Sequence, residues 1–300
     1  MTGTPSAPSP PRRSSGTPRR SSGTLREILA ALLRLGGFTV LFIALFVGFS
    51  LGAGSSESLL VYGVAMCLAA LAATLVLLRL DGRRPLADVG LHRAGAPAHL
   101  SRGFAFGVLI VVPVVALSLA GGLRYGPDGG TAIEYLGTGA WTVLVLLFPA
   151  AAEEILCRGY PLAVLAERWG NAVALLLTTV AFSVLHGANP EVTPLALLNI
   201  ALAGLLLGVV RIVTGSLWAA TGVHLGWNLA TGFLADLPVS GITLVDAPLI
   251  EVTETGRDFI TGGAFGAEGG LASTAAIALA IVYVMRSARR GRADTLGEAG

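Results

Sequence analysis

The sequence contains no lysine, only two cysteines and few charged residues, which make up 13% of its 300 residues. Soluble globular proteins carry about 25% charged residues, so this deficit excludes an ordinary soluble domain. Both cysteines, Cys67 and Cys157, lie inside apolar segments, so they indicate neither a disulfide nor an oxidising compartment. The apolar segments also lack the period-two alternation of a transmembrane β-barrel, and this excludes the barrel class.

Apolar residues dominate instead: 54% of the chain is hydrophobic and the mean hydropathy is +0.76. A nearly uncharged run of about 18 or more residues can cross a hydrocarbon core of about 30 Å as a helix, which satisfies its own backbone in lipid. The sequence therefore predicts an all-α fold, a polytopic transmembrane bundle of about eight helices. The runs fall at about 33–53, 58–80, 103–123, 139–160, 171–187, 194–213, 216–235 and 270–286.

These runs divide the chain into four regions. The first is rich in Arg, Ser and Pro, has no core-forming residues and is expected to be a disordered cytoplasmic tail. The fourth helix is expected to continue through Arg168 and to end at Gly170. The regions are the tail (1–24), three transmembrane helices (25–138), a core of helices four to seven (139–235), and an extracytoplasmic loop with helix eight and a short cytoplasmic tail (236–300).

Arginine is distributed unevenly along the chain. With eight crossings and the N-terminus inside, 18 of the 20 arginines lie in inner segments, and only Arg124 and Arg257 lie outside. The outer loop 236–269 is acidic and contains Glu268 among its carboxylates. This bias follows the positive-inside rule and predicts an integral membrane protein with both termini in the cytoplasm.

Few ionisable side chains remain at membrane depth. A charge at the bilayer centre costs at least about 2.5–3.5 kcal/mol on insertion scales, so such residues are functional candidates. The set consists of Glu153, Glu154, Arg158, His186 and His224, with Asn228 as a polar companion.

Helical spacing brings members of this set together. Glu153 lies 17 residues before Gly170 and His186 lies 16 after it, so on antiparallel helices both are about 24–26 Å from the turn. His224 and Asn228 are four residues apart and share a helix face. Glu154 and Arg158 have the spacing of an ion pair, which leaves Glu153 as the carboxylate free to act.

A glutamate and two histidines from three helices can activate water. Either the carboxylate takes a proton from water directly, or Glu153, His186 and His224 hold a divalent metal such as zinc that lowers the pKa of water. Asn228 or a histidine can then stabilise an oxyanion. No HExxH motif of soluble zinc peptidases occurs. A Cys157 thiol nucleophile and simple hydrogen bonding between helices are the alternatives.

Three motifs in order resemble one family. Glu153-Glu154-Ile-Leu-Cys-Arg158 fits EExxxR, Phe182-Ser-Val-Leu-His186 fits FxxxH, and His224-Leu-Gly-Trp-Asn228 fits HxxxN. Together they resemble the CAAX protease and bacteriocin-processing (CPBP) family of intramembrane peptidases, whose eukaryotic members are the type II CAAX prenyl endopeptidases. The resemblance covers roughly residues 139–235.

The resemblance implies an eight-helix bundle with a water-accessible cavity and an endopeptidase activity, by a metal or by glutamate. Glu153 would activate water, Glu154, His186, His224 and Asn228 would complete the catalytic site, and Arg158 and Phe182 would support it. The expected substrate is a membrane-associated protein or peptide, the only other partner is the lipid bilayer, and no nucleic acid is expected. Abundant Ala, Gly and Arg without Lys suggest a bacterial plasma membrane. A proton-coupled transporter and a non-catalytic scaffold or bacteriocin-immunity protein are the competing hypotheses.

Overall fold

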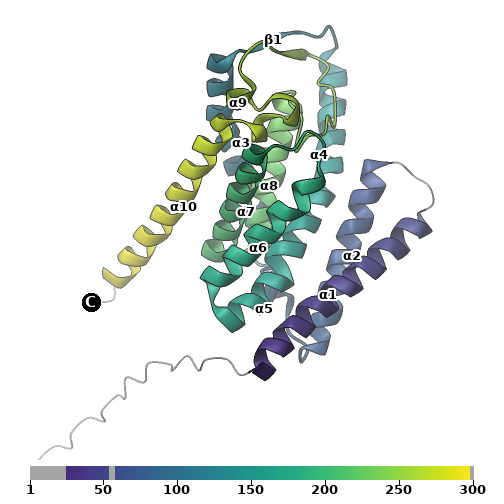
Figure 1. Ribbon diagram of the computed structural model, residues 1–300, viewed down its shortest axis with the longest axis vertical. Coiled ribbons are helices and arrows are strands. Elements are labelled where there is room, and N and C mark those ends of the chain that lie inside the picture. Colours follow the sequence, from purple (N-terminus) through teal and green to yellow (C-terminus); the bar gives the residue numbers. More distant parts are fainter. Residues whose placement is uncertain (1–24, 54–57, 298–300) are drawn as a thin grey trace, which may run out of the picture.

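The chain folds into a bundle of helices with a small two-stranded β-sheet at one end (Figure 1). The computed structural model describes residues 25–53 and 58–297, so the predicted tail 1–24 lies outside the described residues. The α-helices are α1 (Leu25–Gly52), α2 (Leu59–Leu80), α3 (Ala96–Gly121), α4 (Ala132–Glu154), α5 (Tyr160–Trp169), α6 (Asn171–Leu185), α7 (Pro194–Thr214), α8 (Leu217–Leu229), α9 (Asp258–Thr261) and α10 (Leu271–Gly297).

Shorter elements interrupt or connect these helices. Two π-helical turns, η2 (Ile155–Gly159) and η4 (Ala230–Leu234), directly follow α4 and α8. The 3-10 turns are η1 (Leu86–Val89), η3 (His186–Ala188), η5 (Gly263–Phe265) and η6 (Ala267–Gly269). Strands β1 (Leu123–Pro127) and β2 (Ile250–Glu254) pair antiparallel, with Leu123 opposite Glu254. The sequence did not predict this small sheet, which lies outside the apolar runs except for Leu123.

All eight predicted apolar runs are helical, which confirms the polytopic helical bundle. Within the described residues, seven helices are long and apolar enough to cross a membrane. The run 216–235 is not among them, because α8 is short and carries the polar His224 and Asn228. Most of α8 is buried among its neighbours. The expectation of eight crossings therefore stays a prediction.

The predicted extension of the fourth helix is confirmed. α4, η2 and α5 form one continuous span, Ala132–Trp169, and Gly170 follows it with a φ of 81°. Pro161 has no N–H to donate to the preceding turn, so the regular hydrogen-bond ladder is broken next to η2. The chain then reverses into α6, which packs against α5 and α7.

Helix α8 packs unusually closely on α3 through glycines on both helices. A Cβ atom on Gly103 or Gly107 of α3 would lie 2.3 or 2.2 Å from a backbone oxygen of α8. A Cβ atom on Gly222 or Gly226 of α8 would likewise lie 2.3 or 2.2 Å from a backbone oxygen of α3. Both helices thus carry the GxxxG spacing that permits such contact in membranes. This contact fixes the helix that carries His224 and Asn228.

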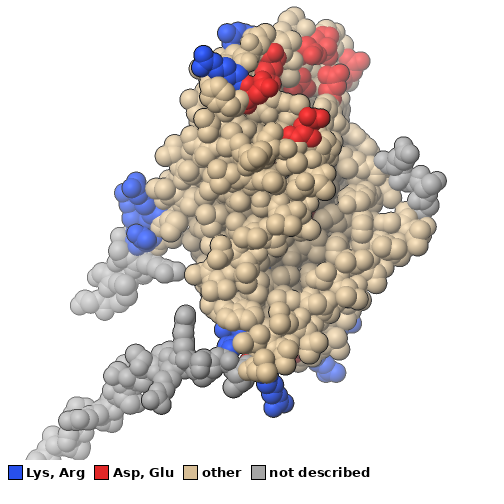
Figure 2. All heavy atoms as spheres, viewed as in Figure 1, with Lys and Arg blue, Asp and Glu red and all other residues tan. Residues whose placement is uncertain are grey.

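The remaining helices flank this pair. α1 and α2 pack together on the α4–α5 side, whereas α10 packs on α7 and α3 and diverges from the bundle towards its C-terminal end (Figure 1). Acidic side chains gather at the end of the molecule that carries the β1–β2 sheet (Figure 2). Basic side chains lie at the opposite end and on α10, with a smaller group beside the acidic one. The molecule is therefore polar at its two ends and apolar between them.

Candidate active site

The two adjacent glutamates at the end of α4 have different surroundings. The side chain of Glu153 is 26% exposed and that of Glu154 is fully buried. Consecutive helical residues point about 100° apart, so one carboxylate faces the predicted site and the other faces the interior. The division that the sequence predicted between these two residues is the one observed.

The carboxylate of Glu154 binds side chains from two helical segments, η2 and α8. Its Oε1 atom accepts hydrogen bonds from Arg158 Nη1 and from His224 Nδ1, both at 3.0 Å. The predicted ion pair between Glu154 and Arg158 is thus present and completely buried. Since the carboxylate also binds His224, it fixes the orientation of an imidazole that the sequence assigned to the site.

Arg158 is held by three different groups. Besides Glu154, its Nη2 atom donates to the carbonyl oxygen of Gly204 on α7 at 2.9 Å. Its guanidinium lies 4.2 Å from the centre of the Phe182 ring, in cation–π contact. These contacts supply a buried cation with a counter-charge, an acceptor and an aromatic face, as a charge in a low dielectric requires.

His186 lies where α6 ends, and its ring is fixed by the preceding turn. Its Nδ1 atom lies 2.8 Å from the carbonyl oxygen of Phe182, and a carbonyl can only accept, so Nδ1 carries the proton. The Phe182 ring packs 4.5 Å from the imidazole. Phe182 thus orients His186 through both its backbone and its side chain.

Three acceptors converge at the centre of the site. The Oε2 atom of Glu153 is 3.7 Å from His186 Nε2 and 3.8 Å from His224 Nε2. It is buried and has no hydrogen-bond partner among the described residues. With its proton at Nδ1, a neutral imidazole presents a lone pair at Nε2. These distances exceed a direct hydrogen bond, and a water molecule between the three atoms could donate to two of them, whereas a cation could bind all three.

The histidines and Asn228 open onto a cavity. Its empty space, including the opening, is about 460 Å³, and its wall includes His186, His224 and Asn228. The cavity has room for water. The structure therefore gathers Glu153, Glu154, His186, His224, Asn228, Arg158 and Phe182 around one region of the bundle.

The donor set at this centre is chemically suited to a metal. Two neutral imidazole nitrogens and one carboxylate are the ligands of a His₂Glu catalytic zinc site. Within the part of the chain that the structure describes, however, only Asp236, Asp246 and Glu251 place three ligand atoms within 4.8 Å of one another. The predicted metal at Glu153, His186 and His224 stays a prediction, with suitable ligand types in a wider arrangement.

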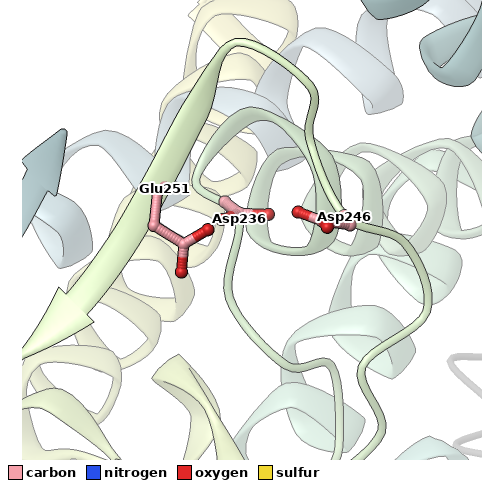
Figure 3. Close-up of side chains that lie close together, drawn as sticks. All are labelled: Asp236, Asp246 and Glu251. Atoms are coloured by element: carbon pink, nitrogen blue, oxygen red, sulfur yellow. The ribbon is translucent and has the colours of Figure 1, made fainter. Parts of the chain in front are cut away.

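Asp236, Asp246 and Glu251 form an acidic group at the β1–β2 sheet, with Glu251 on strand β2 (Figure 3). Asp236 accepts hydrogen bonds from the backbone N–H groups of Ala247 and Val252. Burial, followed by the negative charges of Asp246 and Glu251, raises the pKa of Asp236 above its usual value. Asp246 and Glu251 are exposed, so these carboxylates are a feature of the polar end of the molecule.

Two further residues are buried near the site. Cys157, considered as a nucleophile, is buried in an apolar cluster with Phe182, Ile200 and Phe265. Glu268, which the sequence placed among the outer-loop acids, is only 8% exposed and lies in the wall of the cavity. The one sequence signal for this is the surrounding GGAFGAEGG segment at 262–270, in which Gly262, Gly263 and Gly266 adopt positive φ values and allow tight reversals.

The fold and the site together define a class: an integral membrane bundle with a buried group of carboxylates and imidazoles. Residues 136–230 match the family described as type II CAAX prenyl endopeptidase Rce1-like. Over this segment the chain is similar to the CAAX protease (CPBP) family, which is a family of proteases. The matched segment contains the EExxxR, FxxxH and HxxxN residues. No curated protein and no solved structure matches the chain.

Proposed function

We propose that this protein is an intramembrane endopeptidase that hydrolyses a peptide bond of a membrane-associated protein or peptide. The observation that supports it best is the convergence of Glu153 Oε2 on the Nε2 atoms of His186 and His224, at 3.7 and 3.8 Å. These three acceptor atoms have no donor between them and lie inside an apolar bundle, so they form a binding site for a water molecule.

In this proposal Glu153 is the general base. It takes a proton from the water, the hydroxide oxygen attacks the carbonyl carbon, and the carbonyl oxygen becomes an oxyanion. The Asn228 amide, whose N–H groups have no hydrogen-bond partner among the described residues, stabilises that oxyanion. The proton held by Glu153 then passes to the leaving amine as the C–N bond breaks.

The two histidines act by orientation and charge. With the proton at Nδ1, the Nε2 atom of one ring can accept the second O–H of the water while Glu153 accepts the first, and this directs the water oxygen. Glu154 adds negative charge behind His224 and stabilises that ring if it gains a proton during the reaction. If Glu153, His186 and His224 hold a divalent metal, it would lower the pKa of the water and polarise the substrate carbonyl.

We further infer that the enzyme resides in a bacterial plasma membrane. Bacteria generally lack prenylated CAAX proteins, so the substrate class is a membrane-anchored regulator or a secreted peptide. Immunity to bacteriocins by destruction of the toxin is a related role. The same site chemistry serves each of these substrates, because all present a peptide bond at or within the bilayer.

The test compares membrane fractions of cells that produce the unaltered protein, Glu153→Gln or the control Glu251→Gln. Glu251 is an exposed glutamate on strand β2, outside the matched segment. Since a general base contributes about 10²–10⁴-fold, Glu153→Gln should lower turnover at least about 100-fold, and an uncut substrate should accumulate. Glu251→Gln should leave cleavage unchanged.

Normal cleavage by a correctly inserted Glu153→Gln protein would rule out Glu153 as the base. Metal analysis of the purified protein distinguishes the two routes to an activated nucleophile. A stoichiometric metal that is lost from both His186→Ala and His224→Ala supports the metal route. A metal-free protein that still cleaves supports the glutamate route.

A further inference from the structure

The cavity beside the candidate site contains a second carboxylate. His186, His224 and Asn228 form part of its wall, and Ser240 and Glu268 form another part. Apolar side chains of α7, α8 and α10 supply most of the remaining wall, among them Leu206 on α7. Ligand pockets combine such apolar walls with a few fixed polar groups.

Glu268 is held rigidly at this wall. Its Oε1 atom accepts a hydrogen bond from Trp227 Nε1 at 2.8 Å. Its Oε2 atom accepts from the backbone N–H of Ser240 at 2.8 Å and from the Ser240 hydroxyl at 2.6 Å. Asn199 donates to the carbonyl oxygen of Glu268 at 2.8 Å and thereby also fixes its backbone. Three donors define the direction of the carboxylate and leave acceptor capacity on Oε1.

The negative charge of Glu268 has no cationic partner. None of the ion pairs between described residues includes Glu268. Glu154, by contrast, is fully buried and is paired with Arg158. Hydrogen bonds to neutral donors stabilise a buried carboxylate only in part, because a low-dielectric environment favours a nearby opposite charge strongly. An ionisable side chain of this kind in a membrane bundle indicates a ligand or a functional partner.

The shape and chemistry of the cavity select the kind of ligand. Its apolar walls favour a hydrocarbon stem, and the carboxylate of Glu268 favours a cationic head that donates hydrogen bonds. Arginine and lysine side chains combine these two parts. An acidic side chain would be repelled, and a purely apolar chain would leave the carboxylate desolvated and unpaired.

We propose that Glu268 forms the end of a specificity subsite that binds an arginine or lysine side chain of the substrate near the cleaved bond. This rests on the proposed function, since Asn228 and the two histidines line the same cavity. Glu268 lies outside the segment 136–230 that matches the family, so the preference belongs to this chain's own outer segment. Trp227 and Ser240 position the carboxylate.

The first experiment measures binding without catalysis. Purified Glu153→Gln protein is titrated with n-butylguanidinium and with its neutral isostere n-butylurea, and dissociation constants are obtained from thermal-unfolding shifts. A charge-assisted hydrogen bond in a desolvated pocket should make the cation bind at least about tenfold more tightly. Adding Glu268→Gln should abolish this preference, and adding Glu251→Gln should leave it intact. Equal binding of the two probes to the unaltered pocket would overturn the proposal, whether or not Glu268→Gln folds.

The second experiment reads the cleaved sequences. Membrane-anchored synthetic peptides of randomised sequence are incubated with the reconstituted enzyme, and mass spectrometry locates the cleaved bonds. Arginine and lysine should be enriched at one fixed position relative to the bond, and Glu268→Gln should remove that enrichment while cleavage continues. Cleavage without any such enrichment would contradict the subsite. Cation-selective binding with no cleavage of any peptide would contradict the peptidase and retain the cation site.

Discussion

At the scale of single residues, the site depends on how buried charges compensate one another. Glu154, Arg158 and His224 share one carboxylate oxygen, and Arg158 also contacts Phe182 and the backbone of α7. Removal of one partner of a buried ion pair leaves an uncompensated charge and costs about 3–5 kcal/mol. The ion pair is therefore both a structural element and the support of one candidate catalytic ring.

We predict that Arg158→Met destabilises the protein by about 3–5 kcal/mol, because Glu154 loses its counter-charge. The double variant Glu154→Gln/Arg158→Met should regain most of that stability, since no buried charge remains. It should still be about 10–100-fold slower in peptide cleavage, because the carboxylate behind His224 is gone. Unfolding free energies and cleavage rates of the single and double variants form the measurement. Full activity in the stable double variant would show that Glu154 does not act through His224.

Residue types and spacing predicted much of this site. The ion-pair spacing of Glu154 and Arg158 is local to one helix, and the match in depth of Glu153 and His186 follows from helix rise alone. The bond between Glu154 and His224 joins positions 70 residues apart, so it depends on the packing of α4 against α8. Glu268 was missed for the same reason, because its burial depends on how a glycine-rich loop folds back on α8.

At the scale of elements, the contact of α3 with α8 sets the position of His224 and Asn228. Gly222 and Gly226 lie on either side of His224 in sequence, and both lie against the α3 backbone. The GxxxG spacings are visible in the sequence, but which helices pair through them is settled only by the three-dimensional packing. The π turns after α4 and α8 were likewise unpredictable, since they are small changes of hydrogen bonding within continuous helices.

We predict that Gly226→Ala lowers both stability and activity. The new methyl group would lie 2.2 Å from the carbonyl oxygen of Phe104, so α8 must move away from α3. Overpacking of this kind costs about 1–3 kcal/mol, and the shift moves His224 and Asn228 out of register with Glu153. The control is Gly37→Ala on α1, where a Cβ atom meets nothing within 4 Å. Thermal unfolding and peptide cleavage measure both effects, and a fully active Gly226→Ala protein would contradict this role of the contact.

At the scale of the whole molecule, the polar residues divide the bundle into two ends. Acidic side chains gather at the end that carries the β1–β2 sheet, and most basic side chains in this view lie at the other end and on α10 (Figure 2). Hydropathy predicted the positions and order of the long helices well, because apolar length is a local property of sequence. It could not predict which helices are central, and the most buried one, α8, is the one that length and apolarity do not select.

The orientation of these two ends remains to be measured, and the arginine distribution predicts it. The loop before α3 contains arginines, whereas strand β2, which pairs with β1 at the other end of α3, contains carboxylates, so the positive-inside rule places the loop in the cytoplasm. In a background with Cys67→Ala and Cys157→Ala, Ala94→Cys reports on that loop and Thr253→Cys reports on β2. Both positions are exposed, and they lie at opposite ends of α3. A membrane-impermeant maleimide should label Thr253→Cys in intact cells and Ala94→Cys only after permeabilisation. The reverse pattern would place the arginine-rich end and both termini outside, against the charge rule.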